Sequence, residues 1–319
     1  MTPAGGRARA AALALALLGG GAATGAPPAP LADVHVHYRW DQPESDDPSK
    51  AVAALERNGI ALAVAFGTPA DLGPVLKEAG GERILLLYTP YRITEDKYTW
   101  HQDETVPGRM RAALDTGEYA GIGELHLIGG FAPDWRTPVV SSVLELARER
   151  SLPLLLHVEF GRPEYLIDLC SSNPDLRILW AHAGGLQGPG QVKRVLDACP
   201  GLHVELSARD PWRYVATPIA DEAGRLLPGW RTLILAHPER FMVGSDNVWP
   251  VDGLDRWETG DTGWSEMDRF VAFHRHWMAD LPPGVERKVR LDNALRFFGV
   301  GGEDRASAKH RDLGAGDKP

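Results

Sequence analysis

The strongest constraint on the fold is a repeated alternation of short apolar runs with amphipathic segments between residues 31 and 299. The apolar runs are rich in Leu, Ile, Val and Ala and lack polar alternation, which is typical of strands buried on both faces. Eight such strands are expected, at residues 31–37, 60–66, 83–88, 120–126, 152–158, 176–182, 202–207 and 240–246. The pattern predicts an α/β fold, a single (β/α)8 TIM-type barrel, with a doubly wound open sheet as the alternative.

Helices are expected between these strands. The segment 48–58 follows Asp47, a good N-cap residue, and ends before Gly59. Further helical periodicity predicts helices at residues 137–150, 164–170, 191–198, 267–278 and 289–298. No linker rich in Pro or Ser divides the region, so one domain is expected from residue 27 to 300.

The N-terminal 26 residues have the features of an export signal. Arg7 and Arg9 precede an apolar run at 10–18 and a stretch of small residues that ends at Ala26. Nine apolar residues are too few to span a bilayer, which needs about 20. We therefore expect a cleaved signal peptide at 1–26, export to the periplasm or beyond the cell, and no membrane insertion of the mature chain. Residues 301–319 have no apolar periodicity and are expected to form a disordered tail.

Charge and cysteine content narrow the classes of partner. The 34 basic residues against 43 acidic ones give a net charge of −9, which argues against nucleic-acid binding. A small-molecule substrate is expected instead, and a homo-oligomer is left open. The two cysteines, Cys170 and Cys199, each end a predicted helix. Two separate buried thiols are favoured, and a disulfide is left open because side-chain directions cannot be read from sequence.

Five of the predicted strands end in residues that can bind a metal. His35 and His37 lie two apart in the first strand, so their imidazoles share a face. The fourth, fifth, sixth and eighth strands end at Glu124, His157, His182 and Asp246 respectively. In a barrel these ends meet at one opening, where neutral imidazoles and carboxylates are suited to a divalent transition metal.

These motifs resemble the amidohydrolase superfamily, and in particular its amidohydrolase-2 type of metal-dependent hydrolases. The resemblance rests on the Asp33–His37 start, Glu124, His157, and the runs His182-Ala183-Gly184-Gly185, Gly244-Ser245-Asp246 and 293–298. It implies a distorted barrel that holds one or two divalent ions, usually zinc. His35, His37 and Asp246 would then hold the first ion, His157 and His182 a second, and Glu124 could bridge them. With a single ion, His157 would join the first set and His182 would act as an acid or base.

The resemblance leaves two reaction types open. In the first, a metal-activated water cleaves an amide, lactone or ester bond in a small molecule, and Asp246 and His182 are the catalytic residues that transfer protons. The alternative is a metal-dependent decarboxylase or lyase of a small unsaturated or aromatic acid. Glu124 favours hydrolysis, because the resemblance implies that single-metal decarboxylases of this type lack an acid on the fourth strand.

Polar residues around the predicted opening are candidates for weaker roles. His126, at the end of the fourth strand, is expected to contact substrate or to donate to a ligand, with a solvated loop histidine as the alternative. Arg92 and Arg209 follow strands and are expected to bind substrate, with a loop salt bridge as the alternative for each. Asp33, deeper in the barrel than His35, is expected to orient an imidazole, with a simple structural hydrogen bond as the alternative. Glu205, in the seventh strand, is interpreted as internal polar packing.

Overall fold

The computed structural model describes residues 28–42, 47–127, 133–158, 163–213, 217–249 and 260–301. The expected signal peptide at 1–26 lies outside these residues, and so does nearly all of the expected tail at 301–319. Within the described residues, none of the helices combines the length and the apolar character that a membrane-spanning segment requires.

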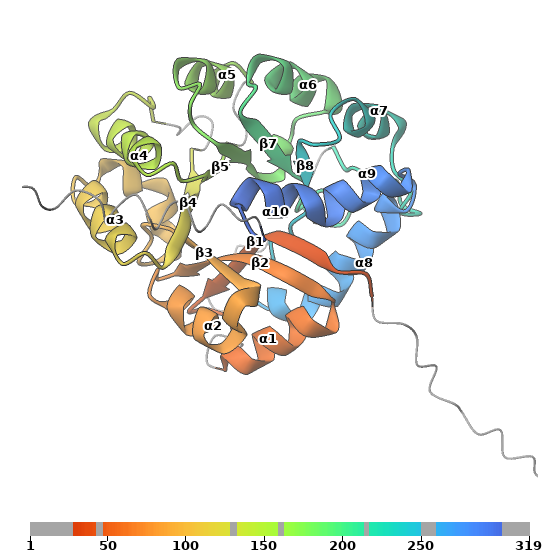
Figure 1. Ribbon diagram of the computed structural model, residues 1–319, viewed down its shortest axis with the longest axis horizontal. Helices are drawn as coiled ribbons and strands as arrows, with labels where there is room; N and C mark the ends of the chain where they lie inside the picture. Colours follow the sequence, from red (N-terminus) through yellow and green to blue (C-terminus); the bar gives the residue numbers. More distant parts are fainter. Residues whose placement is uncertain are drawn as a thin grey trace, which may run out of the picture.

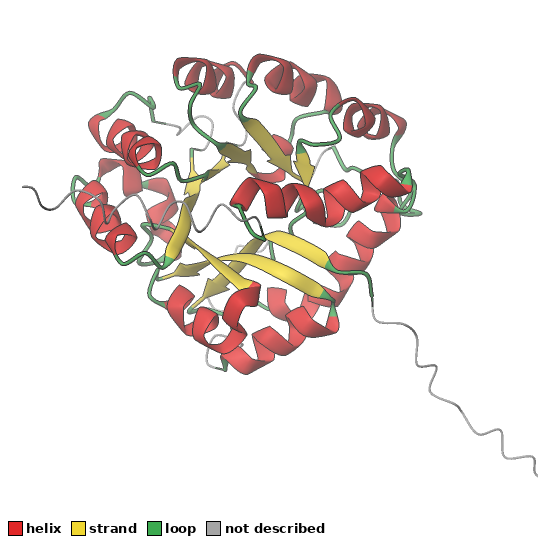
Figure 2. Cartoon of the chain, in the orientation of Figure 1, coloured by secondary structure: helices red, strands yellow, loops and turns green. Residues whose placement is uncertain are grey.

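Eight parallel strands form one sheet in sequential order, and the sheet curls into a nearly closed ring surrounded by helices (Figures 1 and 2). This arrangement confirms the predicted (β/α)8 barrel and excludes the open-sheet alternative. The strands are β1 (Leu31–Arg39), β2 (Ile60–Thr68), β3 (Ile84–Tyr88), β4 (Tyr119–His126), β5 (Leu154–His157), β6 (Ile178–Trp180), β7 (Leu202–Glu205) and β8 (Phe241–Met242).

Helices follow each strand and cover the outside of the barrel (Figure 2). They are α1 (Pro48–Arg57), α2 (Leu72–Gly80), α3 (Val106–Asp115), α4 (Pro138–Glu149), α5 (Pro163–Ser172), α6 (Pro189–Ala198), α7 (Pro228–Ala236), α8 (Met267–Met278), α9 (Pro283–Arg287) and α10 (Asn293–Phe298). The expected N-cap of α1 is present, since the Asp47 side chain accepts a hydrogen bond from the Ser49 main-chain N–H.

Apolar side chains form two separate cores. The larger one lies between the strands and the outer helices. The smaller one fills the barrel interior and includes Val34, Leu155 and Met242, with Ala294 and Phe297 of α10 packed against them. Helix α10 thus closes one end of the barrel, crossing the ring in Figure 1. The polar side chains described below gather at the opposite end, where the strands finish.

The barrel closes where β8 meets β1, partly through a side chain. Main-chain bonds run from Val34 N–H to Val243 O at 3.0 Å and from Asp246 N–H to His35 O at 2.9 Å. Beyond them, the Asn247 side chain accepts from His37 N–H at 2.7 Å and donates to His37 O at 3.0 Å. The amide of Asn247 therefore replaces one residue of the missing β ladder.

A disulfide joins Cys170, in α5, to Cys199, directly after α6, with their Cα atoms 5.8 Å apart. The preference for two separate thiols was therefore wrong. The two helices pack side by side outside β5 and β6 and bring both thiols to the same end, a relation between distant residues that the sequence does not reveal.

Candidate metal centre

Six side chains with metal-binding donors converge at the strand ends. His35 and His37 come from β1, Glu124 from β4 and His157 from the end of β5, while His182 is the second residue after β6 and Asp246 the fourth after β8. All six are buried or nearly so, and the side chain of His37 is the most accessible of them at 12%. The structure thus brings together every residue that the sequence suggested as a metal ligand.

One group of donors surrounds a point between β1, β4 and β8. The Nε2 atoms of His35 and His37 lie 3.3 Å apart, and Asp246 Oδ1 lies 3.0 Å from His37 Nε2 and 3.5 Å from His35 Nε2. Glu124 Oε2 completes the group at 3.4 Å from His35 Nε2 and 3.7 Å from His37 Nε2.

A second group uses the other oxygen of the same glutamate. Glu124 Oε1 lies 2.7 Å from His157 Nδ1 and 3.4 Å from His182 Nε2, and these two nitrogens are 3.2 Å apart. Glu124 therefore faces both groups, one carboxylate oxygen toward each. This is the geometry of a bridging ligand.

The spacing and chemistry of these donors fit a divalent metal. Four ligands around zinc at 2.0–2.2 Å lie about 3.4 Å from one another, close to the separations in both groups. Within the described residues, the ion-pair partners of Glu124 are histidines and not lysine or arginine. Burial alone would raise the pKa of Glu124, but His35, His126 and His157 hold it well below its usual value. A buried anion that relies on titratable imidazoles is well matched to a permanent cation.

A seventh residue, Glu205 of β7, hydrogen-bonds to two of the histidines on the side away from the donor groups. Its Oε1 accepts from His35 Nδ1 at 3.1 Å and from the His182 main-chain N–H at 2.6 Å. The Ser207 hydroxyl links the same oxygen, at 2.9 Å, to His182 Nδ1, at 2.8 Å. Because both Nδ1 atoms are engaged with this network, both Nε2 lone pairs are directed at the donor groups.

The electrostatics of Glu205 agree with this positioning role. Burial raises the pKa of Glu205, but the charges and hydrogen bonds of His35 and His182 lower it to about 2, so it is a carboxylate. The sequence pattern indicated internal polar packing for Glu205 and did not reveal that it hydrogen-bonds to His35 and His182. The predicted role of Asp33 falls to Glu205 instead, because Asp33 Oδ1 accepts from the main-chain N–H groups of His35 and Ser245 and not from an imidazole.

Arg209 does not face the opening, contrary to the expectation that it binds substrate. It is fully buried, and its nitrogens donate to the carbonyls of His182 at 2.6 Å and of Ala183 at 2.6 Å, and to Thr217. His182 and Ala183 adopt positive φ angles of 54° and 49°, so their turn is not stabilised by regular secondary structure. Arg209 holds this turn in place.

Arg213 plays a similar part at the end of β8, and sequence reasoning did not identify it. Asp246 also has a positive φ, of 44°. The buried Arg213 guanidinium donates to Asp246 O at 2.6 Å and Ser245 O at 3.0 Å, and pairs with Asp210 at 2.7 Å. The main chain that carries Asp246 is therefore fixed by a charged side chain from the loop after β7.

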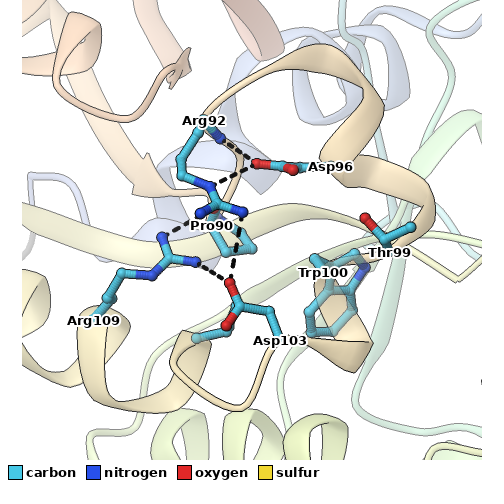
Figure 3. Close-up of a pocket in the computed structure, with 8 residues that line it drawn as sticks. Pro90, Arg92, Asp96, Thr99, Trp100, Asp103 and Arg109 are labelled. Atoms are coloured by element: carbon cyan, nitrogen blue, oxygen red, sulfur yellow. Dashed lines mark hydrogen bonds and ion pairs between the residues drawn. The ribbon is translucent and has the colours of Figure 1, made fainter.

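Arg92, the other arginine expected to contact substrate, lies in a polar pocket beside the loop after β3 (Figure 3). Its guanidinium pairs with Asp96 at 3.1 Å and with Asp103 at 3.7 Å, while its side chain stays 65% exposed. Trp100 lines the same pocket and donates its indole N–H to His126 O at 2.9 Å. The charge of Arg92 is thus engaged by carboxylates of its own loop, as the salt-bridge alternative expected.

Comparisons with known proteins agree with the geometry. The amidohydrolase family model, of the amidohydrolase-2 type, matches residues 98–300. No curated protein matches the chain. The solved structures that resemble it include a TatD homolog from Escherichia coli K12, with a TM-score of 0.60 and 14% identity over 85% of this chain and 98% of that one.

Two further structures resemble the fold to a similar degree. One is an amidohydrolase from Burkholderia multivorans with bound zinc, with a TM-score of 0.54 and 15% identity over 85% of this chain and 99% of that one. The other is a phosphotriesterase homology protein from Escherichia coli with phosphate in its active site, with a TM-score of 0.54 and 13% identity over 84% and 97% of the two chains. The family model covers well over half of the sequence, and the chain therefore belongs to the amidohydrolase family.

Proposed function

We propose that this protein is a metal-dependent hydrolase that uses one or two divalent ions, with zinc as the first choice, to cleave a carbonyl-centred bond in a small molecule. The observation that carries the proposal is the position of Glu124, whose two oxygens face two separate groups of imidazole and carboxylate donors. The zinc bound by the Burkholderia multivorans relative, a property of that protein, supports the choice of metal.

The donors divide between two ions without conflict. His35, His37, Asp246 and Glu124 Oε2 would hold the first, and His157, His182 and Glu124 Oε1 the second. Ions in such a site lower the pKa of water to about 7 and polarise a substrate carbonyl.

Asp246 is the group best placed to transfer the proton. Its Oδ1 lies 3.0 Å from His37 Nε2 and 3.5 Å from His35 Nε2, at the opening where the strands end, while Oδ2 lies 4.0 Å from His182 Nδ1. We assign Asp246 the role of taking a proton from the attacking water and delivering it to the leaving group. The ring of His182 is held by Ser207 and Glu205, which keeps Nε2 free to bind metal.

The experiment begins with the metal content of the purified protein, followed by a screen of lactones, amides, esters and phosphoesters with the bound metal present. Asp246→Asn should abolish hydrolysis while retaining the fold, whereas the surface control Asp168→Asn should leave it unchanged. Pure protein that holds no metal and takes none up on reconstitution would refute the proposal. Release of carbon dioxide from an unsaturated or aromatic acid, with a single ion bound, would establish the lyase alternative.

We also propose that the enzyme works in an oxidising compartment after export. The Cys170–Cys199 disulfide supports this, because such bonds persist in secreted and periplasmic proteins and are rare in the cytosol. Mass spectrometry of natively produced protein, alkylated before lysis, should find both cysteines unmodified and the N-terminus starting at Pro27. Alkylated thiols or an intact N-terminus would refute the proposal.

A further inference from the structure

His126, at the end of β4, is held differently from the imidazoles of the candidate metal centre. Its ring stacks on that of His157, with centroids 4.3 Å apart and planes tilted by 20°. Its main-chain carbonyl accepts from Trp100 at 2.9 Å, and its main-chain N–H donates to the Tyr91 hydroxyl at 2.8 Å. The residue is therefore fixed on both sides of its backbone and on one face of its ring.

The Tyr91 hydroxyl also lies 3.0 Å from His126 Nδ1. The main-chain N–H of His126 can only donate, so the tyrosine oxygen accepts there and has its own proton to place. Burial raises the pKa of Tyr91 well above its ordinary value of 10, so the hydroxyl keeps that proton at any working pH. Within the described residues, His126 Nδ1 is the hydrogen-bond acceptor that the structure offers it.

This contact determines which ring nitrogen of His126 carries the proton. If Nδ1 accepts from Tyr91, the proton of the neutral ring sits on Nε2. Nε2 lies 3.8 Å from Glu124 Oε2, too far for a hydrogen bond, and has no hydrogen-bond partner among the described residues. The His126 side chain is 11% exposed.

We propose that His126 is a catalytic residue that donates an Nε2–H hydrogen bond to a substrate oxygen beside Glu124, and that Tyr91 is a positioning residue that fixes this tautomer. The inference rests on the proposed hydrolase function and deepens it. It separates His126 from the ligand imidazoles, whose Nε2 or Nδ1 lone pairs face the donor groups. It also favours substrates with an oxygen on the carbon under attack, because a neutral N–H donor stabilises charge that develops on oxygen.

The tautomer can be measured without any substrate. In protein labelled with ¹⁵N-histidine, His126 signals are assigned by their loss in His126→Gln. The wild type should show a protonated Nε2 and a hydrogen-bonded, unprotonated Nδ1, and addition of zinc should leave this pattern unchanged. Tyr91→Phe should give a mixture of tautomers, whereas Tyr98→Phe, a change at an exposed tyrosine of the same loop, should have no effect. A protonated Nδ1 in the wild type, or metal ligation by His126, would overturn the proposal.

Kinetics test the role of the donor. Losing one donor to a developing oxyanion reduces kcat by about 100-fold or more, so His126→Leu should do so with little change in KM. His126→Gln, whose amide can donate from nearly the same place, should recover part of the loss. Tyr91→Phe should cost about tenfold, as partners behind a catalytic group do, with metal content unchanged.

The two proposals fail in different ways. A protein that hydrolyses nothing, yet shows Nε2–H at His126, refutes the hydrolase function and with it the donor role, while the tautomer assignment stands. Hydrolysis that is unaffected in His126→Leu refutes the donor role alone.

Discussion

Replacing Glu205 by Gln tests whether the network behind the imidazoles governs metal binding. The carboxylate accepts from His35 Nδ1, His182 N–H and the Ser207 hydroxyl at Oε1, and from Ser207 N–H at Oε2. An amide has one oxygen to meet these donors. If that oxygen stays toward His35, the new NH₂ group opposes Ser207 N–H at 2.7 Å. If it turns, the NH₂ group faces His35 Nδ1 and pushes the imidazole proton onto Nε2, the atom needed for metal.

Either orientation weakens the site without removing a ligand. Losing a partner behind a ligating histidine costs about 10- to 100-fold in metal affinity, or about 1.4–2.7 kcal/mol. The value should lie near the upper end, because Glu205 contacts His35 through its ring and His182 through its main chain, and so affects both donor groups.

The assay is a competition titration of metal-free protein with zinc against a chromophoric chelator of known affinity. Glu149→Gln, a change at an exposed glutamate that pairs with Arg111, is the matched control and should match the wild type. Circular dichroism confirms that both variants fold. Zinc affinity within twofold of the wild type in folded Glu205→Gln would refute the positioning role.

The other predictions concern stability, measured by urea unfolding of metal-free protein. Reducing the Cys170–Cys199 bond, which spans 29 residues, should lower the free energy of unfolding by about 3.6 kcal/mol from loop-closure entropy; a loss below about 1 kcal/mol would contradict this. Arg213→Met should cost about 3–5 kcal/mol because it leaves Asp210 buried and unpaired, and adding Asp210→Asn should recover part of it; equal stability of single and double variants would contradict the pairing. Burial lowers the pKa of His274 to about 4 in the folded protein, whereas the same group in the unfolded chain has its ordinary value of about 6.5. As the pH falls below about 6.5, the unfolded chain therefore binds a proton that the folded protein does not, and the folded state loses stability. Between pH 7.5 and 5 the wild type should therefore lose about 2 kcal/mol more stability than His274→Gln, and equal losses in the two proteins would contradict the lowered pKa.

The sequence predicted the strands well because their apolar runs are buried on both faces. The start of β8 was expected correctly, but regular pairing ends at Met242, since the following residues leave the strand conformation and Asp246 has a positive φ. Four helices, α2, α3, α7 and α9, were not predicted from the sequence. Each carries Pro or Gly in its first turn, where these residues are tolerated although they weaken a helical pattern.

The residues lining the candidate site could be predicted from the sequence because strand ends in a barrel converge. Roles that depend on contacts between residues far apart in the sequence could not be predicted in this way. Glu205 and His35 are 170 positions apart, and a buried acid within a strand reads equally well as packing. Arg209 follows β7, as a substrate-binding residue would, yet the left-handed turn at His182 and Ala183 presents carbonyls that attract its guanidinium. The sequence pattern alone does not distinguish an arginine that binds substrate from one that binds main-chain carbonyls.

The joint between β1 and β8 brings together residues from an early and a late part of the chain. His35 and His37 are synthesised early and Asp246 about 200 residues later. They meet where the Asn247 side chain hydrogen-bonds to the main chain of His37 in β1. A ribosome-bound fragment that lacks β8 would contain the four histidines and Glu124 but not Asp246, which completes the first donor group. A metal ion that needs Asp246 as a ligand would bind the closed barrel more tightly than the fragment. Such binding would therefore stabilise the completed fold.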